Sequence, residues 1–203
     1  MPICIGSEEP NKLLDVAEKS ILRKQVLAQR KSLSEDEFLA LNQLLLAQFK
    51  TLDFSGIKAI HVFLPIVAKR EPDTFLMIDW LQTHYPSMHI VVPKANFEDY
   101  SMSHHLLNKE DLANSHYHIP EPQTTEIFEG KIDMVLVPLL AFDTKGYRVG
   151  YGKGFYDRFL SKIDVKKVGI SLFEAVECIA DVHEDDIRLD LCITPKQIYS
   201  FVS

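Results

Sequence analysis

The chain has 203 residues and carries a formal net charge of −7 at pH 7. An acidic balance of this size argues against non-specific binding to nucleic acid or to an anionic membrane, because both require a basic surface. The apolar fraction of 46% and the charged fraction of 25% are ordinary for a soluble globular protein. We therefore expect a soluble, cytoplasmic and monomeric protein, in which a local basic site for a small anion remains possible.

The three cysteines, Cys4, Cys178 and Cys192, are far apart and show no spacing typical of a zinc site or a disulfide framework. We expect reduced thiols. The first ten residues lack the basic start and apolar core of a signal peptide, and no apolar run reaches the roughly 18 residues of a membrane span. The expected organisation is a loose tail over residues 1–10 and a single domain over residues 11–203.

Residues 12–30 predict a helix with two contrasting faces. Its expected apolar face contains Leu14, Ala17, Ile21 and Ala28. The opposite side carries a narrow basic stripe made of Lys12, Lys19, Arg23 and Arg30. Such a stripe is typical of a solvated helix face, so the pattern alone assigns it no function.

The rest of the chain alternates strands with helices. Ser34 and Glu37 form a capping box that predicts a helix over about residues 35–50, and Asp73 with Thr74 caps a helix over 75–84. A further helix is expected over 153–162, short strands and loops over 95–130, and longer strands over 57–64, 89–92, 133–138, 167–171 and 192–194. This alternation indicates an α/β fold with a largely parallel sheet, whose ligands gather at the carboxyl ends of the strands.

A glycine-rich segment follows the strand expected at residues 133–138. Four of the chain's eight glycines fall within nine residues: Gly146, Gly150, Gly152 and Gly154. They alternate with charged residues, namely Lys145, Arg148, Lys153, Asp157 and Arg158. Glycine permits unusual dihedral angles and close approach of the backbone, so several N–H groups can point at one anion such as phosphate.

The spacing of these glycines matches neither of the two commonest phosphate-binding motifs, GxxxxGK[ST] and GxGxxG. The physical ingredients are nonetheless similar, since Arg148 suits a forked phosphate contact and Lys153 a point-charge contact. A helix expected to begin near Lys153 adds its positive end. Asp157 is either a salt-bridge partner of these cations or a ligand of the Mg²⁺ that accompanies a nucleoside triphosphate.

The run from Phe142 to Arg158 carries a resemblance to a known family. It reads FDTKGYRVGYGKGFYDR and is similar to the pattern FDxxGxRLGxGxGYYDR of the 5-formyltetrahydrofolate cyclo-ligases, also called 5,10-methenyltetrahydrofolate synthetases. Val149 and Phe155 depart from the pattern, but neither removes a charge or a glycine. Further segments resemble the family in the expected order over roughly residues 19–195, and they begin at Lys19, Phe63, Val92 and His183.

The resemblance implies a three-layer α/β/α fold with a mostly parallel sheet, like the NagB/RpiA/CoA-transferase-like fold of sugar-phosphate isomerases and CoA-transferases. It also implies an enzyme that uses ATP as co-substrate and Mg²⁺ as cofactor to convert 5-formyltetrahydrofolate into 5,10-methenyltetrahydrofolate, releasing ADP and phosphate. In that reaction the γ-phosphoryl group passes to the formyl oxygen, and N10 of the folate then closes the ring. Both nucleophiles belong to the substrate, so the protein supplies positioning and charge neutralisation.

The resemblance also assigns residues to roles. The expected ATP contacts are Lys19, Ser20, Ile21, Leu22, Arg23, Arg148, Val149, Gly150, Tyr151, Gly152, Lys153, Gly154, Phe155 and Tyr156. The expected folate contacts are Leu64, Glu71, Tyr151, Gly152, Lys153, Gly154 and Phe155. Glu71 suits the pterin because one carboxylate accepts two N–H bonds. Lys153 and Arg148 are the expected catalytic residues, which stabilise charge on the transferring group, and Asp157 with Asp190 is expected to hold Mg²⁺.

The histidines receive no catalytic role in this interpretation. His183, in an acidic loop, is expected to be a hydrogen-bonded structural residue. The others considered are expected at the surface: His104, His105, His116 and His118.

Two other functions remain open from the sequence. One is a sugar-phosphate isomerase or CoA-transferase-like enzyme, which needs a carboxylate poised for proton abstraction or acyl transfer and leaves the basic amino-terminal helix without a role. The other is a non-catalytic module that binds a nucleotide or a folate.

Overall fold

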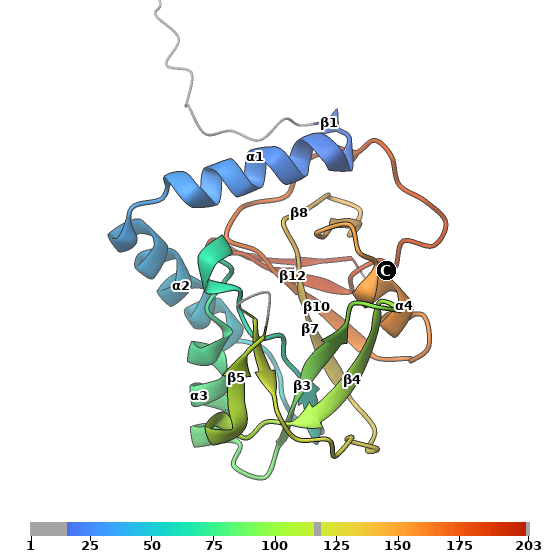
Figure 1. The fold of residues 1–203 in the computed structure, drawn as a ribbon. Helices are drawn as coiled ribbons and strands as arrows, with labels where there is room; N and C mark the ends of the chain where they lie inside the picture. Colours follow the sequence, from blue (N-terminus) through green and yellow to red (C-terminus); the bar gives the residue numbers. More distant parts are fainter. Residues whose placement is uncertain (1–15, 116–118, 202–203) are drawn as a thin grey trace, which may run out of the picture.

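The computed structural model describes residues 16–115 and 119–201, which are built around a seven-stranded sheet (Figure 1). The strand order is β13-β12-β10-β7-β2-β3-β4. The strands span Ala59–His61 (β2), His89–Asn96 (β3), Ser101–Leu106 (β4), Met134–Pro138 (β7), Lys166–Ile170 (β10), Leu191–Ile193 (β12) and Ile198–Ser200 (β13). The central strands are mutually parallel, and the edge strands β4 and β13 are antiparallel to their neighbours. The expected mostly parallel sheet is confirmed.

Helices cover both faces of the sheet. α2 (Glu35–Phe49) and α3 (Thr74–His84) pack on one face, and α4 (Phe155–Leu160) packs on the other (Figure 1). The side chains of β7 alternate accordingly, because Met134 and Leu136 join the core beneath α2 and α3, whereas Val135 and Val137 join the core beneath α4. A central parallel strand is apolar throughout since both of its faces are buried. This is the expected three-layer α/β/α arrangement.

Two helices begin where the sequence predicts. At the start of α2, the Ser34 hydroxyl accepts from the Glu37 N–H, and the Glu37 carboxylate accepts from the Ser34 N–H at 2.7 Å. At the start of α3, the Asp73 carboxylate accepts from the Phe75 N–H at 3.1 Å. These side chains satisfy N–H groups that have no partner within a helix, so each boundary is fixed locally.

The first described helix, α1 (Lys19–Ser32), begins later than predicted. Val16–Ala17 instead forms a short strand, β1, which pairs in parallel with β11 (Cys178–Ile179). Several expectations lie outside the described residues: the tail over 1–10, Cys4, Lys12, Leu14, His116 and His118.

The predicted orientation of this helix is also wrong. Ile21 and Ala28, which were expected to point inward, are exposed. The buried residues of α1 are Lys19, Leu22, Val26 and Arg30. Within the described residues, the basic stripe of α1 therefore faces the protein, because Lys19, Arg23 and Arg30 find polar partners there.

α1 packs on a hairpin that the sequence did not predict. The strands β8 (Ala141–Phe142) and β9 (Arg148–Val149) pair in antiparallel fashion around the turn at Gly146. Leu22 and Val26 of α1 share a core with Ala141 and Val149 of this hairpin. The remaining short elements are η1 (Val67–Lys69), η2 (Lys109–Asp111), β5 (Leu112–Asn114) and β6 (Pro120–Pro122).

Cys178 and Cys192 are both free thiols, as expected. Complete burial of Cys192 raises the pKa of its thiol well above the ordinary value. Across residues 16–115 and 119–201, every helix is too short or too polar to traverse a lipid bilayer.

Gly169 lies in β10, where a larger side chain has no room. An added Cβ would meet Leu189 Cδ1 at 2.6 Å, Leu139 Cδ2 at 2.7 Å and Cys192 Sγ at 3.0 Å. We predict that Gly169→Ala lowers the free energy of unfolding by about 1–3 kcal/mol, because these core side chains must shift. Urea denaturation measures the change. Gly150→Ala is the control, since a Cβ there has no neighbour within 4 Å, and equal stabilities of the two variants would contradict the prediction.

Candidate active site

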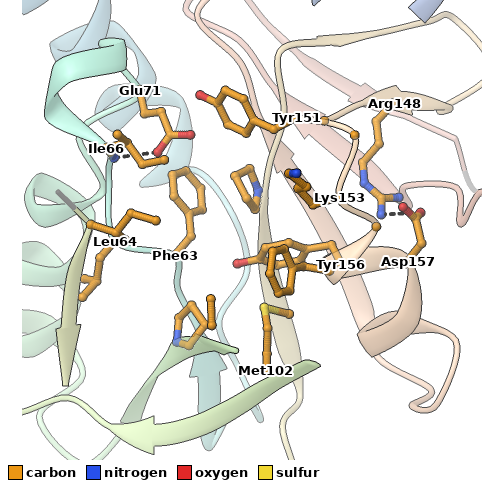
Figure 2. Close-up of a pocket in the computed structure, with 18 of the residues that line it drawn as sticks. Phe63, Leu64, Ile66, Glu71, Met102, Arg148, Tyr151, Lys153, Tyr156 and Asp157 are labelled. Atoms are coloured by element: carbon orange, nitrogen blue, oxygen red, sulfur yellow. Dashed lines mark hydrogen bonds and ion pairs between the residues drawn. The ribbon is translucent and has the colours of Figure 1, made fainter. Parts of the chain in front are cut away.

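A cavity of about 200 Å³ opens at the carboxyl edge of the sheet (Figure 2). Pro138, at the end of β7, lines it together with Phe63 and Leu64, which follow β2. Pro93 and Ala95, from the second half of β3, also line it. The expectation that the ligand site lies at the carboxyl ends of parallel strands agrees with this position.

Most of the predicted site residues meet in this cavity. Those that line it are Lys19, Arg23, Leu64, Glu71, Arg148, Gly150, Tyr151, Gly152, Lys153, Gly154, Phe155, Tyr156 and Asp157. Five others do not: Leu22 and Val149 are buried in the core between α1 and the β8–β9 hairpin, Ser20 and Ile21 are exposed, and Asp190 is described below. The structure thus brings together the cations of α1, the glycine-rich segment and the residues after β2.

The segment between β9 and α4, residues 150–154, is called here the glycine loop, and α1 holds it in place. Arg23 Nε donates to the carbonyl oxygen of Gly150 at 2.8 Å. Arg30 Nη2 donates to the carbonyl oxygen of Leu139, just after β7, at 2.7 Å, and its Nη1 lies 3.4 Å from the Tyr151 hydroxyl. Arg23 and Arg30 therefore attach α1 to the backbone of Gly150 and to the side chain of Tyr151.

Two glycines of the loop adopt backbone conformations that favour glycine. Gly152 has φ 84° and Gly154, the N-cap of α4, has φ 69°. Other residues pay a steric cost in this left-handed region. An added Cβ at Gly152 would also lie 3.4 Å from the guanidinium carbon of Arg23. The two glycines are thus needed for the shape of the loop, and a Cβ at Gly152 would be in ordinary contact with Arg23.

Arg148 and Asp157 form an ion pair beside the loop (Figure 2), with Arg148 Nη2 2.7 Å from Asp157 Oδ1 and the Asp157 side chain 36% exposed. The Arg148 side chain is only 5% exposed, and it also donates to the carbonyl oxygen of Ile187. Burial lowers the pKa of Arg148, and the carboxylates of Asp157 and Asp186 oppose that shift. Arg148 is therefore fixed by its partners, whereas Lys153 on the same wall is exposed.

Asp186 also lines the cavity, although it was not among the predicted site residues. Its carboxylate accepts from the Lys19 ammonium and, at 2.7 Å, from the His183 N–H. Burial raises the pKa of Asp186, but the contacts with Lys19 and with the His183 N–H outweigh it, and the net shift is downward. His183 is thus hydrogen-bonded through its backbone, and its side chain is exposed.

Asp190, which the resemblance pairs with Asp157 as a magnesium ligand, lies outside the cavity. It precedes β12 and stands opposite Lys167 at the amino-terminal ends of the parallel strands, whereas the cavity lies at their carboxyl ends. Its carboxylate accepts from the Lys167 N–H at 2.7 Å and pairs with the Lys167 ammonium at 3.0 Å. The sequence pattern shows that Asp190 directly precedes a strand, but it does not show at which edge of the sheet the residue lies.

Glu71 is almost fully buried at the other end of the cavity. Its Oε2 accepts from the Ile66 N–H at 2.7 Å (Figure 2). Burial raises the pKa of Glu71, and hydrogen bonds from Ile66 and Tyr151 and the charges of Arg30 and Lys69 only partly oppose the shift. Glu71 is thus a carboxylate held at a defined angle in an apolar setting.

A second buried carboxylate, Glu121 on β6, also lines the cavity and was not anticipated. Burial raises the pKa of Glu121, and a hydrogen bond from the Ala95 backbone opposes this shift. The same wall contains Met102 and Ile119. Residues 95–130 offered no periodic pattern from which this wall could be read.

The predicted surface position of two histidines is wrong. His105 is 2% exposed, and its ring nitrogens lie 2.8 Å from the Ser103 hydroxyl and 2.6 Å from the Glu126 carbonyl oxygen. His104 is half-buried, and its ring stacks on Phe159 with centroids 4.2 Å apart. Both belong to β4, in which successive side chains point to opposite faces, so His104 packs against α4 and His105 against the segment containing Glu126.

The carboxylates of the cavity fit a magnesium ion that arrives with a polyphosphate. Within the described residues there is no cluster of three or more His, Cys, Asp or Glu side chains able to hold a metal ion. Mg²⁺ in nucleotide sites requires only one or two carboxylates, together with phosphate oxygens and water. Asp157 and Asp186 both line the cavity and supply that donor type.

Comparison with known proteins agrees with this geometry. The model of the 5-formyltetrahydrofolate cyclo-ligase family matches residues 15–195. A 5-formyltetrahydrofolate cyclo-ligase from Mycoplasma pneumoniae is 29% identical over 191 residues, which cover 88% of this chain and 99% of the relative.

Solved structures show the same likeness. The NMR structure of 5,10-methenyltetrahydrofolate synthetase from Aquifex aeolicus superimposes with a TM-score of 0.77 at 31% identity, covering 91% of this chain and 93% of that one. A 5,10-methenyltetrahydrofolate synthetase from Mycoplasma pneumoniae gives a TM-score of 0.67 at 28% identity, covering 87% and 98%.

The fold and the cavity define an α/β protein with a cation-lined pocket at the carboxyl edge of its sheet. With the match over most of its length, the chain belongs to the 5-formyltetrahydrofolate cyclo-ligase family.

His61 lies at the end of β2, completely buried, in contact with the rings of His104, Tyr156 and Phe159. Neither of its ring nitrogens has a hydrogen-bond partner among the described residues. Burial lowers the pKa of His61 well below its ordinary value, and the neighbouring His104 adds to the shift. His61 is therefore neutral in the folded protein.

We predict that His61 makes the protein less stable in mild acid. As pH falls below the ordinary histidine value of about 6.5, the unfolded state binds a proton that the folded state excludes, so stability is lost. The free energy of unfolding falls between pH 7 and pH 5, and this fall should be about 2 kcal/mol smaller in His61→Gln than in the wild type. Urea denaturation at both pH values measures the difference, and identical losses in the two proteins would refute the prediction.

Proposed function

We propose that this protein is an ATP- and Mg²⁺-dependent 5-formyltetrahydrofolate cyclo-ligase. It converts 5-formyltetrahydrofolate into 5,10-methenyltetrahydrofolate and releases ADP and phosphate. One observation carries the proposal: in a chain of this family, a single cavity joins a cationic glycine loop to an apolar wall with a buried carboxylate. The cationic glycine loop suits a triphosphate, and the apolar wall with its buried carboxylate suits a pterin.

The triphosphate binds between α1 and the glycine loop. Lys19 and Arg23 reach it from the helix, and Lys153 reaches it from the loop. The glycines let backbone N–H groups point at phosphate oxygens. Asp157 and Asp186 would hold the magnesium ion, which would neutralise phosphate charge.

The folate binds on the side of Glu71. Phe63, Leu64, Met102 and Ile119 form an apolar wall for the pterin and its linker. The Glu71 carboxylate accepts hydrogen bonds from the amino and ring N–H groups of the pterin. A buried carboxylate suits this role because it discriminates strongly against ligands that cannot supply those donors.

The chemistry needs two displacements. The formyl oxygen attacks the γ-phosphorus, and the bond from that phosphorus to ADP breaks. N10 then attacks the activated formyl carbon, loses its proton, and the carbon–oxygen bond breaks with departure of phosphate. Lys153 neutralises charge on the transferring group, Arg148 fixes Asp157, and the apolar wall excludes water from the activated intermediate.

The direct test mixes pure protein with 5-formyltetrahydrofolate, Mg²⁺ and ATP. The expected result is an ATP-dependent rise in the near-ultraviolet absorbance of the methenyl product, with one ADP formed per product. If both ligands bind without that rise in absorbance, the protein is a non-catalytic binding module and not an enzyme. If neither ligand binds, the proposed function of the cavity is refuted.

We predict that Lys153→Ala lowers kcat by about 100- to 1000-fold, because it removes a charge that acts on the transition state. The KM for 5-formyltetrahydrofolate should change much less. Circular dichroism confirms folding, which this exposed residue should not affect. Lys162→Ala, which removes an exposed lysine outside the cavity, is the matched control. Wild-type turnover in Lys153→Ala would rule out its proposed role.

A further inference from the structure

Arg30 is a buried cation that the proposed mechanism does not use. The residue is 1% exposed, although it belongs to a helix on the outside of the protein (Figure 1). Arginine is almost never fully buried unless it is paired, because removing its charge from water is costly. Burial accordingly lowers the pKa of Arg30, and nearby Tyr151 and Glu71 oppose the shift. The partners of Arg30 should therefore reveal why it is buried.

Those partners connect α1 to the folate end of the cavity. Arg30 Nη2 donates to the Leu139 carbonyl oxygen at 2.7 Å, which fixes the guanidinium plane. Its Nη1 lies 3.4 Å from the Tyr151 hydroxyl oxygen. The Tyr151 hydroxyl in turn donates to the Glu71 carboxylate, and Figure 2 shows it directed toward Glu71. A continuous path thus runs from Arg30 through Tyr151 to Glu71.

We propose that Arg30 is a positioning residue, which acts through Tyr151 to keep Glu71 ionised and aimed for the pterin. The proposal rests on the proposed function, since it takes Glu71 as the folate-binding carboxylate. It also links the two subsites, because α1 carries Lys19 and Arg23 toward the triphosphate and Arg30 toward the pterin.

The groups that face Glu71 come from four elements: Arg30 of α1, Lys69 of η1, Tyr151 of the glycine loop and Tyr156 of α4. The two tyrosines are neutral, since burial raises the pKa of each far above neutral pH. Lys69 is exposed, with its ammonium 4.1 Å from the centroid of the Tyr151 ring. Water screens an exposed charge more than a buried one, so Arg30 is the cation suited to act on Glu71.

The sign of the effect follows from the burial of Glu71. Because burial raises its pKa, the ionised form that binds the pterin is lost as pH falls. Removing the charge of Arg30 raises that pKa further. In Arg30→Met, the acid limb of kcat/KM for 5-formyltetrahydrofolate should therefore move to higher pH. The KM for the folate at pH 7 should rise about tenfold, the usual scale for loss of a charged hydrogen bond.

The test compares wild type, Arg30→Met, Arg30→Lys and Tyr151→Phe, with Arg188→Met as control. Arg188 also donates to a backbone carbonyl, that of Lys145, but it is exposed and lies outside the cavity. We expect the acid limb to shift to higher pH in Arg30→Met and Tyr151→Phe, and to shift less in Arg30→Lys. We expect no shift in Arg188→Met. An unshifted limb in both Arg30→Met and Tyr151→Phe would overturn the proposal.

A second measurement separates this proposal from the proposed function. The carboxyl carbon of Glu71 is titrated by NMR in wild type and in Tyr151→Phe, which retains the Arg30 charge and the ring but breaks the path. A higher pKa of Glu71 in the variant supports the path, and equal values overturn it, whether or not the protein forms methenyl-folate. An inactive wild type would refute the cyclo-ligase assignment alone.

Discussion

The attachment of the glycine loop to α1 is the interaction on which the pocket depends. The loop lies between a two-residue strand and a six-residue helix, and its glycines give it little order of its own. Arg23 supplies a fixed partner for Gly150, and Arg30 supplies partners for Leu139 and Tyr151. The helix thus imposes a shape that the loop sequence permits but does not enforce.

The second constraint is that Lys19 and Arg148, two cations beside the pocket, are each held by a carboxylate. Arg148 with Asp157 and Lys19 with Asp186 form ion pairs across elements that are distant in the sequence. A buried charge without a partner is strongly destabilising, so each pair ties the position of one element to another. Although the protein has a net charge of −7, these pairs keep two cations at the wall of the cavity, where a polyanion can bind them. The ion pair of Lys19, with the carbonyl partners of Arg23 and Arg30, explains how α1 can turn its basic side inward.

The sequence predicted best what is decided locally. The capping box of Ser34 and Glu37, the cap at Asp73 and the glycine-rich segment all depend on neighbouring residues, and the structure confirms the caps and places the segment at the cavity. The inward face of α1 depends on what packs against it and was predicted wrongly, and the position of Asp190 beside Lys167 likewise follows only from the tertiary structure. Asp186 and Glu121 were missed because only tertiary contacts distinguish them from other acidic loop residues.

The central claim is that the pocket brings the γ-phosphoryl group of ATP to the formyl oxygen of the folate. The most direct test uses 5-formyltetrahydrofolate labelled with ¹⁸O in the formyl group, with phosphorus NMR of the inorganic phosphate after one round of turnover. Direct transfer predicts that the labelled oxygen leaves the folate in that phosphate. Unlabelled phosphate, with the label released as water, would contradict the account.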